Sequence, residues 1–289
     1  MKLKYLKIIY PRQFLKMLVL LLFFCGPVVL AATPSRAMLI LDDMVFIGPK
    51  SSAAIFKVKN ATTRPEAYRL GWVQLRLKPG GGKEKIAPGE TVENVMPAEP
   101  YMYMAPRRLM LMPDQLQHVR FMVRRMENLP AGEYRSYIVF QPEVVPDQYN
   151  PETGRETVSS GTSVQMDMLS GFRIPVFFLN GETTLKTYVS EAGYGRDAKG
   201  KNGVYFTFVR EGNRSAIGDL EVRCMQGDQI VKLTGVEVKI YTELNERNYF
   251  LPIKNIPPGC TTAYLEYSPH AADPDFTGNF VRLAEIPLQ

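Results

Sequence analysis

The chain has few of the side chains on which enzymes and metal sites depend. Its 289 residues include two histidines, His118 and His270, together with three cysteines and one tryptophan. The histidines and cysteines form no CxxC pair and no Cys/His cluster, so the sequence predicts no metal site. Nucleophilic catalysis needs a base held beside the nucleophile, and two isolated histidines without a supporting motif offer none. The chain is therefore expected not to be an enzyme.

Two short patterns lack what a catalytic or nucleotide site would need. Asp42 and Asp43 are adjacent, and neighbours in a strand point to opposite faces, so they are not expected to work as an acid and base pair. The glycines at residues 80–82 resemble a phosphate-binding loop only superficially, because no Gly-Lys-Ser or Gly-Lys-Thr follows and no helix is expected to begin there. The sequence predicts no cofactor.

The beginning of the chain lacks acidic residues. Residues 1–32 contain five basic and no acidic side chains, an apolar run at residues 17–24, and the small residues Ala31 and Ala32 at the end. This order predicts a secretory signal peptide at residues 1–32, cleaved after Ala31 or Ala32. A retained membrane anchor is the alternative, although Gly26 and Pro27 interrupt the apolar segment. No membrane insertion is expected after cleavage.

Little charge of either sign remains in excess once the signal is removed. The formal net charge of +6 falls by five, to +1, so the sequence pI of about 9.1 belongs mostly to residues 1–32. A nearly neutral secreted chain lacks the excess of positive charge with which proteins bind the phosphate backbone of a nucleic acid. We therefore expect no nucleic-acid partner.

The mature chain keeps two cysteines, Cys224 and Cys260. An oxidising compartment would allow them to form a disulfide that closes a loop of about 35 residues. The alternative is a pair of buried thiols that pack as small hydrophobic groups.

No segment after residue 32 carries a convincing helical stripe of apolar residues. Apolar residues instead alternate over short runs bounded by turn signals, which predicts an all-β fold. The length fits two immunoglobulin-like β-sandwich domains, at residues 33–180 and 181–289, divided where Asn180 and Gly181 end a long run.

Each domain is expected to contain seven strands, and residues 78–85 and 142–161 are expected to be flexible connections. The predicted strands of the first domain are residues 37–46, 53–59, 67–77, 101–112, 118–124, 134–141 and 164–178. Those of the second domain are residues 184–190, 204–210, 217–225, 235–241, 249–253, 262–267 and 280–286.

Residues 164–178 are the most informative stretch, because large apolar side chains occupy alternate positions along it. A period of two over fifteen residues predicts one long strand with one apolar face. Most strands have about five or six residues, so this one is expected to extend past its own sheet. Proteins normally protect such an edge with charge or proline, so an intact one predicts pairing with another chain. The positions concerned are Val164, Met166, Met168, Phe172, Ile174, Val176 and Phe178.

The order of several segments resembles the periplasmic PapD-like chaperones of the chaperone-usher pilus pathway. In the first half these are LDDMVFIG at residues 41–48, RRLMLMP at 107–113, GEYRSY at 132–137 and FRIPVFF at 172–178. In the second half, residues 218–220, 235–236, 251–252 and 283–286 look like the divergent archaic branch of that family. The resemblance covers almost the whole mature chain.

The resemblance implies two immunoglobulin-like domains in a boomerang arrangement, which cap pilus (fimbrial) subunits in the periplasm and deliver them to an outer-membrane usher. The seventh strand of the first domain would fill a groove in the subunit by donor-strand complementation. On this basis Val164, Met166, Met168, Phe172 and Ile174 form the subunit-binding strand. When free, the chain would be a monomer or a weak strand-to-strand dimer.

The better-known members of the family anchor the subunit's terminal carboxylate with an arginine and a lysine, but Asp43 and Pro175 stand at the matching positions here. A carboxylate removed from water still needs a charged donor, and a guanidinium suits it best. We therefore predict Arg135 as the anchor, with Arg173 or Arg120 as helper. The alternative is that these arginines are exposed and only balance the surface charge.

A different class of function also fits the sequence. The chain could be a secreted adhesive or structural β-sandwich protein whose long strand pairs within its own assembly. A chaperone should form a one-to-one complex with a co-expressed subunit, whereas an adhesive module should bind glycan or self-assemble.

Overall fold

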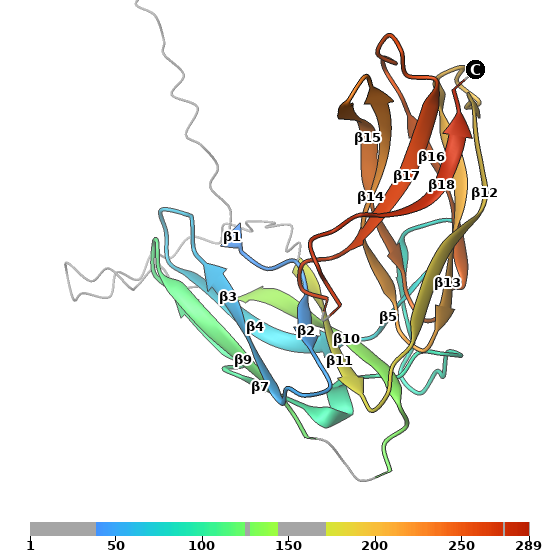
Figure 1. Ribbon diagram of the computed structural model, residues 1–289. Coiled ribbons are helices and arrows are strands. Elements are labelled where there is room, and N and C mark those ends of the chain that lie inside the picture. Colours follow the sequence, from blue (N-terminus) through green and yellow to red (C-terminus); the bar gives the residue numbers. More distant parts are fainter. Residues whose placement is uncertain (1–38, 125–127, 144–171, 274, 289) are drawn as a thin grey trace, which may run out of the picture. The chain divides into compact units, whose positions relative to one another are not determined.

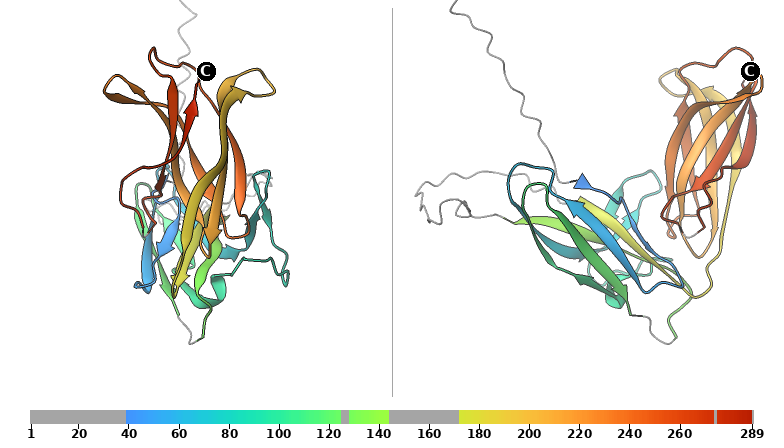
Figure 2. Two further views of the ribbon diagram at one scale, coloured as in Figure 1. Left: turned by 45° about the vertical axis from the view of Figure 1, so that its right-hand side comes forward. Right: turned by 60° about the vertical axis from the view of Figure 1, so that its left-hand side comes forward.

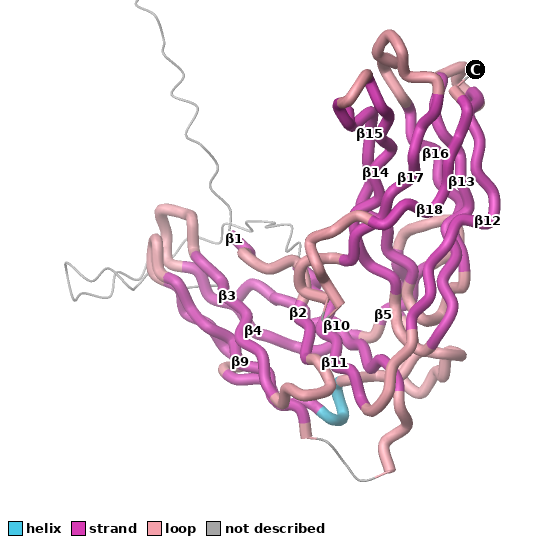
Figure 3. Tube along the Cα trace, viewed as in Figure 1, coloured by secondary structure: helices cyan, strands magenta, loops and turns pink. Residues whose placement is uncertain are grey.

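The computed structural model describes residues 39–124, 128–143, 172–273 and 275–288, and Figure 3 shows that nearly all of its regular structure is β. Within these ranges the helical segment is one short 3₁₀ turn, η1 (Glu99–Tyr101). No helix in them is long and apolar enough to cross a bilayer. The signal peptide predicted at residues 1–32 lies outside the described residues. The prediction of an all-β fold is confirmed.

The first half of the chain forms two facing sheets and a small hairpin. One sheet has the order β1-β3-β9-β7, the other β2-β11-β10-β4-β8, and β5 pairs with β6. The strands are β1 (Leu39–Ile40), β2 (Val45–Ile47), β3 (Ala53–Lys59), β4 (Glu66–Val73), β5 (Leu75–Leu77), β6 (Lys83–Lys85), β7 (Met102–Ala105), β8 (Arg108–Leu111), β9 (Leu116–Val123), β10 (Gly132–Glu143) and β11 (Phe172–Asn180).

The core of this first sandwich lies between the two sheets, which Figures 1 and 2 show as two layers. Strand β9 illustrates how the sequence builds it: Val119 and Phe121 are fully buried, while Arg120 and Met122 between and beyond them are exposed. This alternation places apolar side chains on one face of the strand. Phe140 from the facing sheet belongs to the same core cluster.

Three of the predicted long strands are wrong in one respect, because each is two strands in different sheets. Residues 37–46 split into β1 and β2, residues 67–77 into β4 and β5, and residues 101–112 into β7 and β8. Between β7 and β8 the reason is local, since Pro106 has no backbone N–H with which to continue the ladder beyond Ala105. An alternating pattern continues when the chain passes from one sheet to the other, so periodicity alone does not reveal the change.

The flexible connection predicted at residues 78–85 is also wrong, because its last three residues form β6 and pair with β5. Leu75 and Leu77 are buried, and the guanidinium of Arg76 bridges Glu84 and Glu90. The turn uses Gly81 and Gly82, whose φ angles of 92° and 77° lie in the left-handed region that favours glycine. The hairpin is therefore held by packing and by ion pairs.

The second half forms another sandwich, with sheets β12-β13-β16 and β15-β14-β17-β18. Each of the seven strands predicted here is confirmed, with longer bounds in most cases. They are β12 (Leu185–Arg196), β13 (Asn202–Gly212), β14 (Ala216–Gln226), β15 (Gln229–Ile240), β16 (Glu246–Pro252), β17 (Thr262–Pro269) and β18 (Val281–Pro287). No sheet within the described residues combines strands from both sides of Asn180. All these strands lie in one compact unit, Ala37–Gln289.

A disulfide joins Cys224 on β14 to Cys260, which confirms the predicted pair. Both cysteines are buried in the core of the second sandwich. The bond links residues 36 positions apart.

Replacing both Cys224 and Cys260 by alanine is expected to lower the free energy of unfolding by about 3–4 kcal/mol, because the unfolded chain regains the entropy of an open loop. Urea denaturation of the oxidised protein and the variant measures the difference. Reduced wild-type protein serves as control and should behave like the variant. A loss below about 1 kcal/mol would show that the bond adds little to this sandwich.

Candidate functional site

Strand β11 is paired on both sides along only part of its length. Its register with β10 runs without a shift from Phe172, opposite Phe140, to Asn180, opposite Gly132. On its other side β2 pairs in parallel with Val176–Phe178 alone. Among the described residues, therefore, no strand covers the second edge of residues 172–175. An uncovered edge can accept a strand from another chain.

The side chains at the beginning of β11 differ in accessibility. Ile174 is 7% exposed and belongs to the core of the first sandwich with Val176 and Phe178. Phe172, the first residue of the strand, is 41% exposed. The binding role predicted for Ile174 stays a prediction, and Phe172 is the described member of the set that a partner can reach directly. The other members, Val164, Met166 and Met168, lie outside the described residues.

Strand β10 is buried on both of its faces. Ile138 and Phe140 face the core of the first sandwich. Tyr137 lies on the opposite face and is also fully buried, in a second apolar cluster that includes Phe177 and Tyr241. Because successive side chains alternate, Glu133 and Arg135 share this second face with Tyr137. A polar group placed there is removed from water and needs a partner.

Arg135 has such a partner within the chain. Its Nη2 donates to both carboxylate oxygens of Glu243, at 2.9 and 2.8 Å, and its guanidinium lies 4.1 Å from the centroid of the Tyr241 ring. Nη1 is 3.9 Å from a carboxylate oxygen of Glu133, and both Arg135 and Glu133 are only 2% exposed. The structure thus supplies Arg135 with carboxylates of its own chain, and its role as anchor for another chain stays a prediction.

Burial and neighbouring charges of opposite sign shift the pKa values of Arg135 and Glu133 in opposite directions. Burial alone would lower the pKa of Arg135, but Tyr137, Glu243 and Glu133 raise it above its usual value. Burial raises the pKa of Glu133, against the effects of Arg135 and of the hydrogen bonds that Ser215 donates through its backbone N–H and hydroxyl. Arg135 is therefore permanently charged, and its Nε and Nη1 are buried without hydrogen-bond partners in the described part of the chain.

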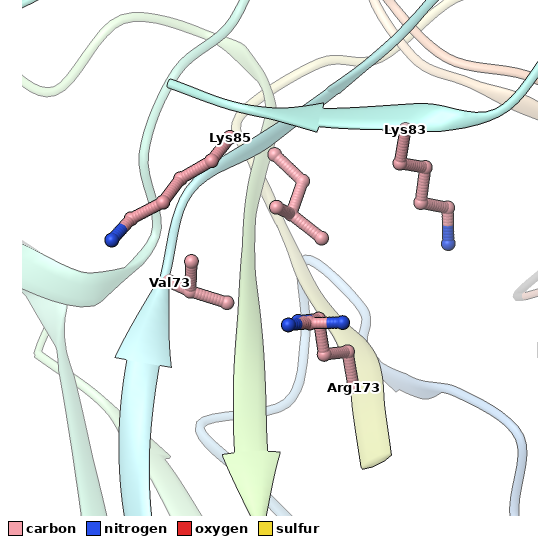
Figure 4. Close-up of a pocket in the computed structure, with 5 residues that line it drawn as sticks. Val73, Lys83, Lys85 and Arg173 are labelled. Atoms are coloured by element: carbon pink, nitrogen blue, oxygen red, sulfur yellow. The ribbon is translucent and has the colours of Figure 1, made fainter. Parts of the chain in front are cut away.

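A cavity of about 340 Å³ lies beside the beginning of β11. In Figure 4 the side chain of Lys83 extends from β6 toward the level of Arg173, which lies at the beginning of β11, whereas the ammonium of Lys85 extends away from both. No acidic residue lines it, and none of its three cations forms an ion pair among the described residues. The lining residues are Val73, Leu75, Lys83, Lys85 and Arg173.

Lys83 was missed by the sequence interpretation because it follows three glycines and resembled part of a loop. Its ammonium is 4.8 Å from the centroid of the Tyr137 ring and 5.8 Å from that of Tyr241. Partial burial of the ammonium, followed by repulsion from Lys239 and Arg135, lowers the pKa of Lys83 to about 8. The side chain is exposed along part of its length, so solvent screens some of this effect.

The structure does not bring the three predicted arginines together. Arg173 lines the cavity, and Arg135 lies on the same outer face of the sheet that contains β10 and β11. Arg120 is on β9 in the other sheet, opposite Ile55, and points away from the core because Val119 and Phe121 on either side point into it. The outer faces of the two sheets are opposite sides of the sandwich, so Arg120 cannot share a ligand with the other two.

One group of potential metal ligands occurs among the described residues, formed by Asp43, Glu237 and His270, whose ligand atoms lie within 4.8 Å of one another. The ammonium of Lys239 is 2.6 Å from Glu237 and 4.0 Å from Asp43, where a cation would bind. The Nδ1 of His270 accepts a hydrogen bond from the N–H of Ala272, so neutral His270 carries its proton on Nε2, 3.3 Å from Asp43. This arrangement is an ion-pair network.

No protein-family model and no curated protein matches the chain. Several solved structures of fimbrial chaperones are similar to it. The chaperone and tip adhesin complex of CFA/I fimbriae biogenesis has 11% identity and a TM-score of 0.42, and the alignment covers 85% of this chain and 96% of that one. The CsuC–CsuE pre-assembly complex from archaic Csu pili of Acinetobacter baumannii has 11% identity and a TM-score of 0.41, with coverages of 86% and 98%.

The CupB2 chaperone of Pseudomonas aeruginosa has 8% identity and a TM-score of 0.40, and the alignment covers 87% of this chain and all of that one. Similarities of this size are too low to carry a function from those proteins to this chain. The function therefore has to be argued from the residues described above.

Proposed function

We propose that this chain is a non-enzymatic periplasmic chaperone that binds pilus subunits by donor-strand complementation and delivers them to an outer-membrane usher. Its energy source would be the folding of the subunit itself. The resemblance of residues 41–48, 107–113, 132–137 and 172–178 to that family first suggested this role. The proposal depends on one structural observation, the edge of β11 at residues 172–175.

The edge of β11 has the three properties that strand donation requires. It carries backbone groups that no strand of the described residues pairs on one side. It is held rigidly on the other side by β10, so little order has to be gained when a partner binds. It begins with the exposed aromatic side chain of Phe172, four positions after the last of the alternating residues 164–168. A subunit that lacks a strand could therefore find both backbone partners and apolar side chains here.

The cavity beside this edge supports the same role. A strand paired along residues 172–175 would have one end near Arg173, which lines the cavity. A chain terminus that carries a carboxylate would there meet a guanidinium with no ion-pair partner in the described part of the chain. Arg173 is thus the member of the predicted anchor set that can reach such a ligand, and Arg135 would contribute through the field of its permanent charge.

Co-expression with a candidate subunit tests the proposal. The mature chain, tagged, would be produced with a neighbouring secreted protein whose immunoglobulin-like domain lacks its last strand. We expect a one-to-one complex and protection of the subunit from proteolysis. A subunit fused to residues 164–178 of this chain is the control, because its filled groove should no longer be captured. Failure to retain any subunit, together with glycan binding or self-assembly, would favour a secreted adhesive protein instead.

A further inference from the structure

The outer face of the sheet β12-β13-β16, whose strands Figure 1 labels in the second sandwich, combines glycines with aromatic side chains. Gly193 on β12 stands opposite Tyr205 on β13, and Tyr205 stands opposite Phe250 on β16. In the next row Gly195 stands opposite Gly203. Two aromatic residues thus lie side by side in a part of the sheet where the neighbouring positions have no side chains.

Tyr205 points away from the core of the sandwich. Val204 and Phe206 on either side of it are buried in that core, and successive side chains of a strand point to opposite faces. Residues directly opposite each other in an antiparallel pair share a face, so Phe250 also belongs to the outer side. Tyr205 is 42% exposed.

The glycines give the two rings room to lean over the sheet. A Cβ at Gly193 would collide with the hydroxyl end of the Tyr205 ring, and a Cβ at Gly195 would lie 3.4 Å from the Cε1 of the same ring. A Cβ at Gly203 would lie 2.7 Å from the Cζ of Phe250. Each ring therefore extends over positions of the neighbouring strand, and we call Tyr205 and Phe250 the aromatic platform.

The backbone itself does not require glycine at these three positions. None of Gly193, Gly195 and Gly203 has a φ angle in the left-handed region. Glycine inside a strand weakens the strand, because it costs conformational entropy and packs against nothing. Its contribution here is the space in which the rings of the platform lie.

Carboxylates border the aromatic platform. Glu191 is two positions from Gly193 on β12, and Glu246 is four positions from Phe250 on β16, so both share the outer face. Neither forms an ion pair among the described residues, and both are exposed. Lys186, a cation on the same face, is already 3.6 Å from Glu211. The surroundings of the platform therefore carry an excess of negative charge.

We infer that the aromatic platform and Glu191 bind the guanidinium of an arginine on a partner protein. The inference goes beyond the proposed function and does not depend on it. The face of an aromatic ring attracts a cation, and a planar guanidinium can stack on the ring while it donates to a carboxylate. Glu191 is a diagonal neighbour of Tyr205, at a separation of about 7–8 Å that one bound arginine can bridge. An open sheet face also suits a side chain of another protein better than an enclosed small molecule.

The test uses three peptide probes that differ in one side chain. N-acetyl-Gly-Arg-Gly-amide, the same peptide with citrulline and the same peptide with lysine are titrated at low salt into the ¹⁵N-labelled mature chain. Citrulline keeps the planar shape of the arginine side chain but carries no charge. Chemical-shift changes at the backbone amides of Gly193, Gly195 and Gly203 report binding on the platform. We expect the arginine peptide to bind at least about threefold more tightly than either of the other two.

Three variants separate the ring from its position and from the carboxylate. Tyr205→Leu should remove the preference for arginine, whereas Tyr205→Phe should keep it, because the face of the ring does not need the hydroxyl group. Gly193→Ala keeps the ring but displaces it from the sheet, and should weaken binding of the arginine peptide at least about threefold. Glu191→Gln should reduce the advantage of arginine over citrulline. The melting temperature of each variant checks that it is folded.

Tyr188→Leu is the matched control on the same face of β12. The ammonium of Lys186 is already 5.1 Å from the centroid of the Tyr188 ring, and the Tyr188 hydroxyl donates to Glu211. This variant should bind the arginine peptide within about twofold of the wild type. Equal binding of the arginine and citrulline peptides by the wild type, or an unchanged preference in Tyr205→Leu, would overturn the inference. The rings would then only shield the backbone of the glycines.

Discussion

Replacing Glu243 by leucine is expected to lower the free energy of unfolding by about 3–5 kcal/mol, because Arg135 would then keep its charge in a buried position without its main partner. Arg135 is 2% exposed and donates to both oxygens of this carboxylate. The N–H of Leu77 would lose its acceptor at the same time. Urea denaturation followed by tryptophan fluorescence measures the loss, since the single Trp72 packs against the core of the first sandwich.

Three companion variants identify the cause of that loss. Glu243→Gln keeps a carbonyl for Leu77 but removes the charge, so it should be destabilised less than the leucine variant. The double variant Arg135→Met with Glu243→Leu removes both charges and should recover most of the stability. Glu237→Leu breaks an ion pair with Lys239 that is partly exposed to solvent, and should cost less than about 1 kcal/mol. A double variant no more stable than Glu243→Leu would show that the buried charge of Arg135 is not the cause.

Replacing Phe172 by aspartate is expected to weaken subunit capture at least about hundredfold. The phenylalanine would lose about 1.5–3 kcal/mol of apolar burial in the partner, and a carboxylate in the same place would add a desolvation cost. Phe172 is 41% exposed and leads into the edge that no described strand covers, so the free protein should keep its stability. The measurement is the amount of co-purified subunit at equal expression, with the melting temperature as a check on folding.

Tyr103→Asp is the matched control for the strand edge. Tyr103 is an exposed aromatic residue on β7, in the sheet that does not contain β11. If donation occurs at β11, the tyrosine variant should capture the subunit as the wild type does. Equal losses in the two variants would instead indicate a general need for exposed aromatic residues, and no loss in Phe172→Asp would exclude this edge as the contact.

The sequence predicted the architecture well and the strand boundaries of the first half less well. Every strand of the second half could be located, because each alternating run there stays in one sheet. In the first half the chain repeatedly passes from one sheet to the other within a single apolar run, as between β4 and β5. The pattern of burial does not change at such a point, so it carries no signal of the crossing.

The site could be predicted only in part. The long alternating run identified the edge that begins at Phe172, because a local period of two is readable without a structure. Arg135 was predicted as the anchor for a carboxylate of another chain, and its contact with Glu243 of the same chain was missed, because Glu243 lies 108 positions away and no local pattern connects the two. Lys83 offered no signal, since its position depends on a hairpin whose glycines suggested a loop.

Pro175 gives the edge of β11 a property of its own. The ladder between β10 and β11 continues through the pair Tyr137 and Pro175 without a shift, so the N–H that proline lacks would have pointed to the side of β2. Strand β2 begins its pairing at Val176, the next residue. The pairing with β2 is thus limited to Val176–Phe178, and residues 172–175 keep one edge that no described strand covers, with no N–H donor at Pro175.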